Sequence, residues 1–103
     1  MTPDDFRSRL RRVALMRDLT QSDLSVWFAR PRPTVRTWWA GTARPTPGLV
    51  FDECVRRLSL LEQSPDFPVP YDVFKFDRRD YIKKAFMNAN NAGVLESDPA
   101  GSR

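Results

Sequence analysis

Four arginines lie close together in the first half of the chain, in a stretch that is nearly free of acids. Within residues 19–48 the only acidic residue is Asp23. The basic residues of the same stretch are Arg30, Arg32, Arg36 and Arg44. A guanidinium group is weakly hydrated and presents a planar fork of donors, which suits phosphates and the edges of guanine bases better than lysine does. The pattern predicts a polyanion as the ligand, and its alternative is a solvated basic face that binds nothing.

The chain lacks the residue types that most catalytic and metal-binding sites need. The chain has 103 residues, no histidine and a single cysteine, Cys54. Triads and acid–base schemes that use histidine are therefore excluded, as are most transition-metal sites. Asp77 and Asp80 are better explained as helix-capping residues, because no third ligand or base accompanies them. We expect no enzyme activity, no cofactor and no metal, and a lone cysteine fits a reducing, cytoplasmic compartment.

The positive charge is concentrated in one part of the chain. The net charge is +4 and the isoelectric point is about 9.8. Residues 1–63 carry eleven arginines, no lysine and seven acids, whereas residues 64–103 carry six basic and six acidic groups. No apolar run approaches the ~20 residues that span a bilayer, and the first residues are too polar to open a signal peptide. We expect no membrane partner.

The spacing of apolar and capping residues predicts helices that must position these arginines. Thr2 and Thr20 each stand where a helix N-cap is expected, with an acidic residue three positions later. The second of these helices must end before Arg30, because two prolines follow it closely. A third helix is expected over residues 33–40, with Val35 and Trp38 on its buried side. Gly41 is a natural end for it.

The remaining chain divides at a proline-rich segment. A fourth helix is expected to open at Thr46 and Pro47 and to complete a domain over residues 1–63. Three prolines within residues 64–70 predict a stiff linker, which we place at residues 64–76. A C-terminal helix is expected in residues 77–95, with Gly93 ending its main part, and a flexible tail in residues 96–103.

Two short helices joined by a tight turn, between two longer helices, are typical of a helix-turn-helix. Four segments match that motif without gaps: RLRRV at residues 9–13, LTQSDL at 19–24, TVRTW at 34–38 and GTARP at 41–45. On these segments, residues 6–61 resemble the lambda-repressor-like (Cro/XRE-type) family of DNA-binding proteins. Ala29 stands where that family usually has a glycine in the turn.

The resemblance implies an all-α bundle of about five helices whose third helix enters the major groove of double-stranded DNA. The base-reading positions of the family fall on Arg32, Pro33, Arg36 and Thr37. Its phosphate-contacting positions fall on Gln21 and on the loop of Thr42, Ala43 and Arg44. From the helical spacing and the charge we add Arg30 and Thr34 to the phosphate-binding residues. Pro33 has no N–H, so it cannot donate a hydrogen bond to a base or a phosphate.

The C-terminal segment is rich in aromatic residues and neutral overall. We expect it to pack on the bundle, to pair with a second copy or to bind another protein. Because a single helix-turn-helix rarely binds tightly alone, we favour a homodimer. The residues assigned to the dimer or partner surface are Phe74, Phe76, Tyr81 and Phe86.

These observations favour a small bacterial or phage transcriptional regulator, most readily a repressor that occupies an operator as a dimer. Two alternatives use the same DNA-binding domain. A phage DNA-packaging recognition subunit, like a small terminase, would assemble as a ring of many copies. An antitoxin would use its C-terminal segment to bind a toxin.

Overall fold

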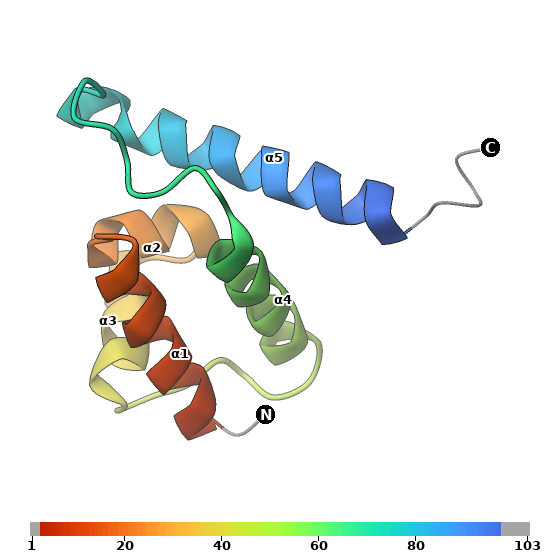
Figure 1. The fold of residues 1–103 in the computed structure, drawn as a ribbon. Helices are drawn as coiled ribbons and strands as arrows, with labels where there is room; N and C mark the ends of the chain where they lie inside the picture. Colours follow the sequence, from red (N-terminus) through yellow and green to blue (C-terminus); the bar gives the residue numbers. More distant parts are fainter. Residues whose placement is uncertain (1–2, 98–103) are drawn as a thin grey trace.

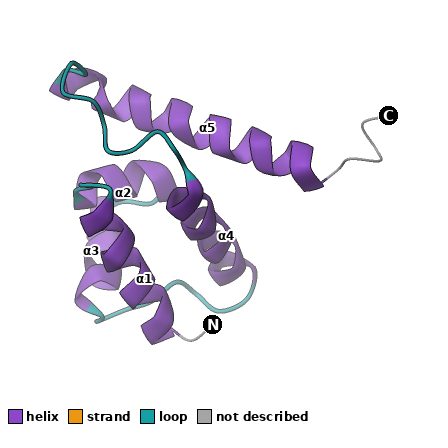
Figure 2. Cartoon of the chain, in the orientation of Figure 1, coloured by secondary structure: helices purple, strands orange, loops and turns teal. Residues whose placement is uncertain are grey.

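The chain folds as an all-helical bundle, as expected from its sequence (Figures 1 and 2). The computed structural model describes the backbone of residues 3–97 and the side chains of residues 4–92, and contains no strand in that part. The elements are α1 (Pro3–Met16), α2 (Gln21–Phe28), α3 (Arg32–Ala40), α4 (Leu49–Gln63), the 3-10 turn η1 (Lys75–Asp77) and α5 (Arg78–Ser97). Helices α1 to α4 form a compact group, and α5 lies across one end of it (Figure 1).

The core is formed by the apolar sides of all five helices. Phe6 of α1 lies at its centre: its ring is 6.2 Å from that of Phe28, 5.8 Å from that of Trp38 and 5.9 Å from that of Phe51. The pairs with Phe28 and Trp38 are edge-to-face, and pairs of this kind add ~0.5–1.5 kcal/mol to the stabilisation from burial alone. The angle between α1, α2 and α3 is therefore set by aromatic packing.

Local signals at the ends of α2 and α3 are confirmed. The hydroxyl of Thr20 accepts a hydrogen bond from the backbone N–H of Asp23 at 3.1 Å, and the Asp23 carboxylate accepts one from the N–H of Thr20 at 2.9 Å. Helix α2 ends at Ala29 with φ 54°, and α3 ends at Gly41 with φ 80°. Both φ values lie in the left-handed region, which explains why glycine would be favoured at position 29.

Three helix boundaries differ from the prediction. Helix α3 begins one residue earlier, at Arg32, because Pro33 is tolerated within the first turn. Helix α4 begins at Leu49 rather than at Thr46, after Gly48 adopts φ 98° and ψ −140°, a conformation that other residues rarely reach. Helix α5 continues through Gly93 to Ser97, since one interior glycine costs only ~1 kcal/mol. The remainder of the predicted tail, residues 98–103, and the predicted cap at Thr2 lie outside the described residues.

The proline-rich segment packs against the bundle. Ser64 and Phe67 are buried, and the Phe67 ring lies edge-on to Trp27 with 5.6 Å between centroids. Arg17 of α1 donates hydrogen bonds to the carbonyls of Glu62, at 2.8 Å, and Phe67, at 3.3 Å. The segment therefore closes one end of the core. The division of the chain at residue 63 into a domain and a linker stays a prediction.

Helix α5 completes the core from the same side. Ile82 and Ala85 are buried, and α5 packs mainly on α2 and α4. The Phe86 ring stands edge-on to Trp27 at 5.1 Å, and the Arg57 guanidinium lies 4.4 Å from the centroid of Phe86. A cation over an aromatic ring contributes ~0.5–1 kcal/mol at an exposed site and more where water is excluded. Helix α5 is thus held by both apolar and charged contacts.

Candidate nucleic-acid interface

Helix α3 is buried on one side and exposed on the other. The exposed fractions of Val35 and Trp38 are 0% and 4%, and both side chains belong to the core. Arg32, Pro33 and Arg36 are exposed. Residues four apart share one face of an α-helix, so the two arginines project from the same face, one turn apart. The structure therefore brings together three of the four predicted base-reading residues.

The fourth residue, Thr37, is half-buried beside them. Its hydroxyl donates a hydrogen bond to the carbonyl of Thr34 at 2.6 Å. A hydroxyl has one proton, so Thr37 can offer an outside partner acceptor capacity and its methyl group, but no donor in this rotamer. Thr34 is also half-buried.

The conformation of the loop after α3 is constrained at Gly41, its first residue. Gly41 has a positive φ, and a Cβ atom built there would lie 3.0 Å from the Arg7 guanidinium. Arg7 in turn donates from Nε to the carbonyl of Trp39 at 3.0 Å, which ties α1 to the end of α3. The three residues that follow are exposed: Thr42, Ala43 and Arg44. A side chain at position 41 would disturb both the turn and the arginine that holds it.

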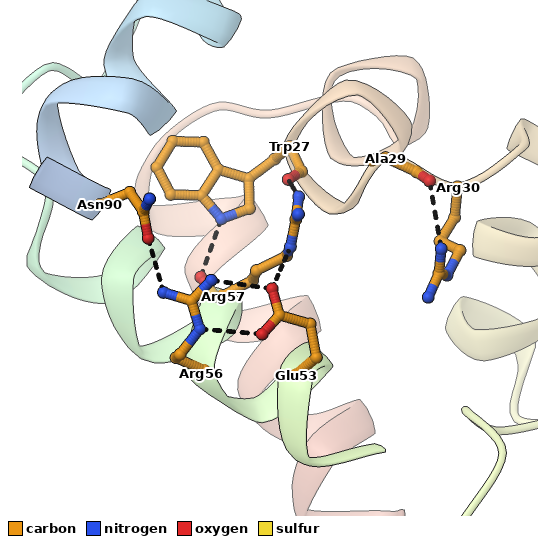
Figure 3. A network of polar contacts seen from close by, with 7 residues as sticks. All are labelled: Trp27, Ala29, Arg30, Glu53, Arg56, Arg57 and Asn90. Atoms are coloured by element: carbon orange, nitrogen blue, oxygen red, sulfur yellow. Dashed lines mark hydrogen bonds and ion pairs between the residues drawn. The ribbon is translucent and has the colours of Figure 1, made fainter. Parts of the chain in front are cut away.

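Two predicted phosphate-binding residues belong to α2 and the turn after it. Gln21 is the first residue of α2, where unpaired backbone N–H groups and the helix dipole favour an anion. Arg30 follows the end of α2 and is half-buried. The one hydrogen bond of its side chain within the described chain is a long contact of 3.5 Å to the carbonyl of Ala29 (Figure 3). Most N–H donors of the Arg30 guanidinium therefore remain available to an outside partner.

The arginines fall into two classes. Those of the first class form ion pairs: Arg9 with Glu62, Arg56 and Arg57 with Glu53, and Arg78 with Asp23. Those of the second class form no ion pair with any residue that the structure describes, and four of them belong to α3 or to the loops on either side of it: Arg30, Arg32, Arg36 and Arg44. The others lie on α1, directly after it or on α5: Arg7, Arg11, Arg12, Arg17 and Arg79. The surface around α3 thus carries positive charge that the described chain does not neutralise.

The only acid within residues 19–48 is neutralised from α5. Both oxygens of Asp23 accept hydrogen bonds from Arg78, at 2.8 Å from Nε and at 2.7 Å from Nη2, and Asp23 is buried. Arg78 also donates to the carbonyl of Asp18 at 3.2 Å. Nothing local in the sequence indicates this pair, whose partners are 55 residues apart. It neutralises the one acidic residue within α2 and fixes the first residue of α5.

A polar network behind the turn connects α2, α4 and α5 (Figure 3). Trp27 donates from its indole N–H to the carbonyl of Arg57 at 2.8 Å, and Arg57 donates to the carbonyl of Trp27 at 2.9 Å. Arg57 also contacts Glu53 at 2.9 Å, and Arg56 reaches Asn90 of α5 at 2.6 Å. The hydrogen bond from Arg56 is the main cause that lowers the pKa of Glu53 to about 2. The network holds the end of α2, and with it the turn that leads into α3.

The predicted dimer or partner residues separate into two pairs. Phe74 and Phe76 are exposed, at 74% and 93%, and Tyr71 nearby is fully exposed. Tyr81 and Phe86 instead contact the bundle of their own chain: the Tyr81 hydroxyl donates to the carbonyl of Asp66, and Phe86 packs on Trp27. The structure therefore leaves the segment before α5, and not the aromatic residues within α5, for an outside partner.

Other kinds of site find little support in the described residues. No group of three or more potential metal ligands occurs among them. Cys54 is buried, which raises the pKa of its thiol above the ordinary value. None of the described helices has the length and apolar character to cross a membrane.

Comparisons with protein-family models, with curated proteins and with solved structures yield no significant match to this chain.

Proposed function

We propose that the chain binds double-stranded DNA in a sequence-specific manner, with α3 in the major groove. The observation that carries this proposal is the surface of α3, where Arg32 and Arg36 project side by side and form no ion pair with any described residue, while Val35 and Trp38 anchor the helix. Helices α2 and α3 are joined by three residues, 29–31, as in a helix-turn-helix. An α-helix fits the major groove, and an arginine can form two hydrogen bonds with O6 and N7 of guanine.

The roles of the remaining residues follow from their positions. Gln21 and the loop of Thr42, Ala43 and Arg44 bind phosphates and set the orientation of the protein on the duplex. Arg32 and Arg36 read bases, whereas Pro33 and Thr37 offer apolar contact or an acceptor. This division of labour is the one that the resemblance to the lambda-repressor-like family implies.

The biological role that we infer is transcriptional regulation by a dimer that occupies an operator. The exposed aromatic rings of Phe74, Phe76 and Tyr71 support a second protein surface. A two-fold dimer would place its two α3 helices in successive major grooves, ~34 Å apart. A packaging subunit would use the same rings in a larger assembly, and an antitoxin would use them to bind its toxin. The number of copies in the assembly distinguishes the three.

The proposed roles are tested by comparing Arg36→Ala with Arg44→Ala on a selected binding site and on random duplexes. Loss of a base contact in Arg36→Ala should remove ~1–3 kcal/mol of discrimination at one base position. Arg44→Ala should weaken binding to all sequences alike and lower the salt dependence by about one unit. Equal losses on both kinds of DNA for both variants would contradict the assignment.

A further inference from the structure

A second basic surface lies beside the turn between α2 and α3, and it belongs to α5. Arg79 and Lys83 are exposed, one helical turn apart. They line a hollow together with Arg30 and the adjoining residues of the turn. Arg79 also lines a neighbouring hollow, with Lys75 and with Arg32 of α3. Cations from α5 therefore converge on the same recesses as two of the arginines assigned to DNA.

The packing of α5 fixes the direction of these two side chains. Arg78 is held by Asp23 of α2, and Ile82 is buried in the core. Arg79 and Lys83 each follow one of these anchored residues, at a spacing that places them together on the neighbouring face. They are thus carried by a rigid helix and not by a mobile tail.

Acidic groups do little to offset this charge. The hollow that contains Arg79 and Lys83 has no acidic residue in its lining. The neighbouring hollow contains Asp18 and Asp23, and the carboxylate of Asp23 is already paired with Arg78. Among the residues that the structure describes, neither Arg79 nor Lys83 forms an ion pair. Two small residues, one of α2 and one of the turn after it, line the same hollow: Ser25 and Ala29.

We propose that Arg79 and Lys83 bind the phosphate backbone of the duplex next to the segment read by α3. The proposal rests on the DNA-binding function proposed above and extends its contact surface beyond residues 1–63. Arg30 lies between the two surfaces and makes them continuous. The contacts add affinity without sequence preference, because phosphates carry no base information.

The test is the salt dependence of binding of the full chain to a pool of random-sequence duplexes, measured by fluorescence anisotropy. Neutralising one phosphate contact lowers the slope of log K against log salt concentration by about 0.9. Arg79→Gln/Lys83→Gln should therefore have a slope that is shallower by about 1.8. Lys84→Gln is the matched control, because Lys84 is exposed on the same helix and lines neither hollow. Arg79→Lys/Lys83→Arg keeps both charges and should retain the wild-type slope.

The outcomes separate this inference from the DNA-binding proposal. If the wild type binds duplexes and the double variant keeps the wild-type slope, the inference is wrong while the DNA-binding proposal stands. A loss of slope per neutralised charge in Lys84→Gln as large as that in Arg79→Gln/Lys83→Gln would also overturn it, because net charge alone would then explain the loss. If the wild type binds no duplex, the DNA-binding proposal fails, and the inference fails with it.

Discussion

The ion pair between Asp23 and Arg78 should couple α5 to the helix that precedes the turn. Asp23 accepts from Thr20 within the capping box and from Arg78 on its other side, so one carboxylate serves both a helix N-terminus and a tertiary contact. We consider two near-isosteric variants, Asp23→Asn and Arg78→Gln. The first removes the buried charge and keeps an oxygen for Thr20. The second leaves the carboxylate buried without its cation.

The burial of the two side chains sets the expected size of each effect. The exposed fraction of the Asp23 side chain is 6%, whereas that of Arg78 is 31%. Breaking a fully buried pair costs ~3–5 kcal/mol, and an exposed pair contributes ~0–1 kcal/mol. Arg78→Gln should therefore lower the free energy of unfolding by about 2–3 kcal/mol. Asp23→Asn should cost less, about 1–2 kcal/mol, since the arginine that it leaves behind can reach water.

Urea unfolding of the wild type, both single variants and the double variant forms a double-mutant cycle. We expect a coupling energy of about 1–2 kcal/mol, with Arg78→Gln the more destabilised of the two single variants. Two changes that add without coupling would show that the pair is not formed in solution. A larger loss in Asp23→Asn than in Arg78→Gln would refute the argument from burial.

Three further predictions concern other parts of the chain. The pKa of Glu53 is lowered from 4.5 to about 2, so its ion pairs stabilise the fold above pH 4.5 and lose this effect as the pH falls toward 2. The difference in free energy of unfolding between the wild type and Glu53→Gln should hence be constant near neutrality and shrink below pH 4.5, and a constant difference down to pH 2 would contradict it. Truncation after Gln63 removes the buried Phe67 and α5, and each removal costs several kcal/mol of apolar burial. The urea midpoint of the truncated chain should therefore fall well below that of the full chain. An unchanged midpoint would show that residues 64–103 add no stability. Phe74→Ser/Phe76→Ser should leave the circular dichroism spectrum unchanged and convert the proposed dimer to a monomer in sedimentation experiments, whereas an assembly of unchanged mass would remove these rings from the interface.

Several features that depend only on neighbouring residues are predicted correctly from the sequence, although the start of α4 and the end of α5 are not. The capping box of Thr20 and Asp23 and the end of α3 at Gly41 involve only a few residues each, and both are confirmed. The buried side of α3 follows from the helical spacing of Val35 and Trp38, because that spacing alone places both on one face.

Features that depend on distant residues are the ones that the sequence does not reveal. The proline-rich composition around Phe67 indicates an extended backbone, but it does not show that this ring fills a gap beside Trp27. The net charge of residues 64–103 is zero, and this sum does not reveal that Arg79 and Lys83 line a hollow without an acidic residue. The first feature arises when the proline-rich segment packs on α2, and the second when α5 does.

The central claim, that α3 reads the sequence of duplex DNA, is tested most directly by selection of bound duplexes from a random library at near-physiological salt. The account predicts an enriched inverted repeat whose half-sites are ~10 base pairs apart, or a multiple of that distance. In parallel, Arg36→Ala should lose the preference at one position of each half-site. A selection that enriches no sequence, with binding that depends only on salt concentration, would contradict the claim.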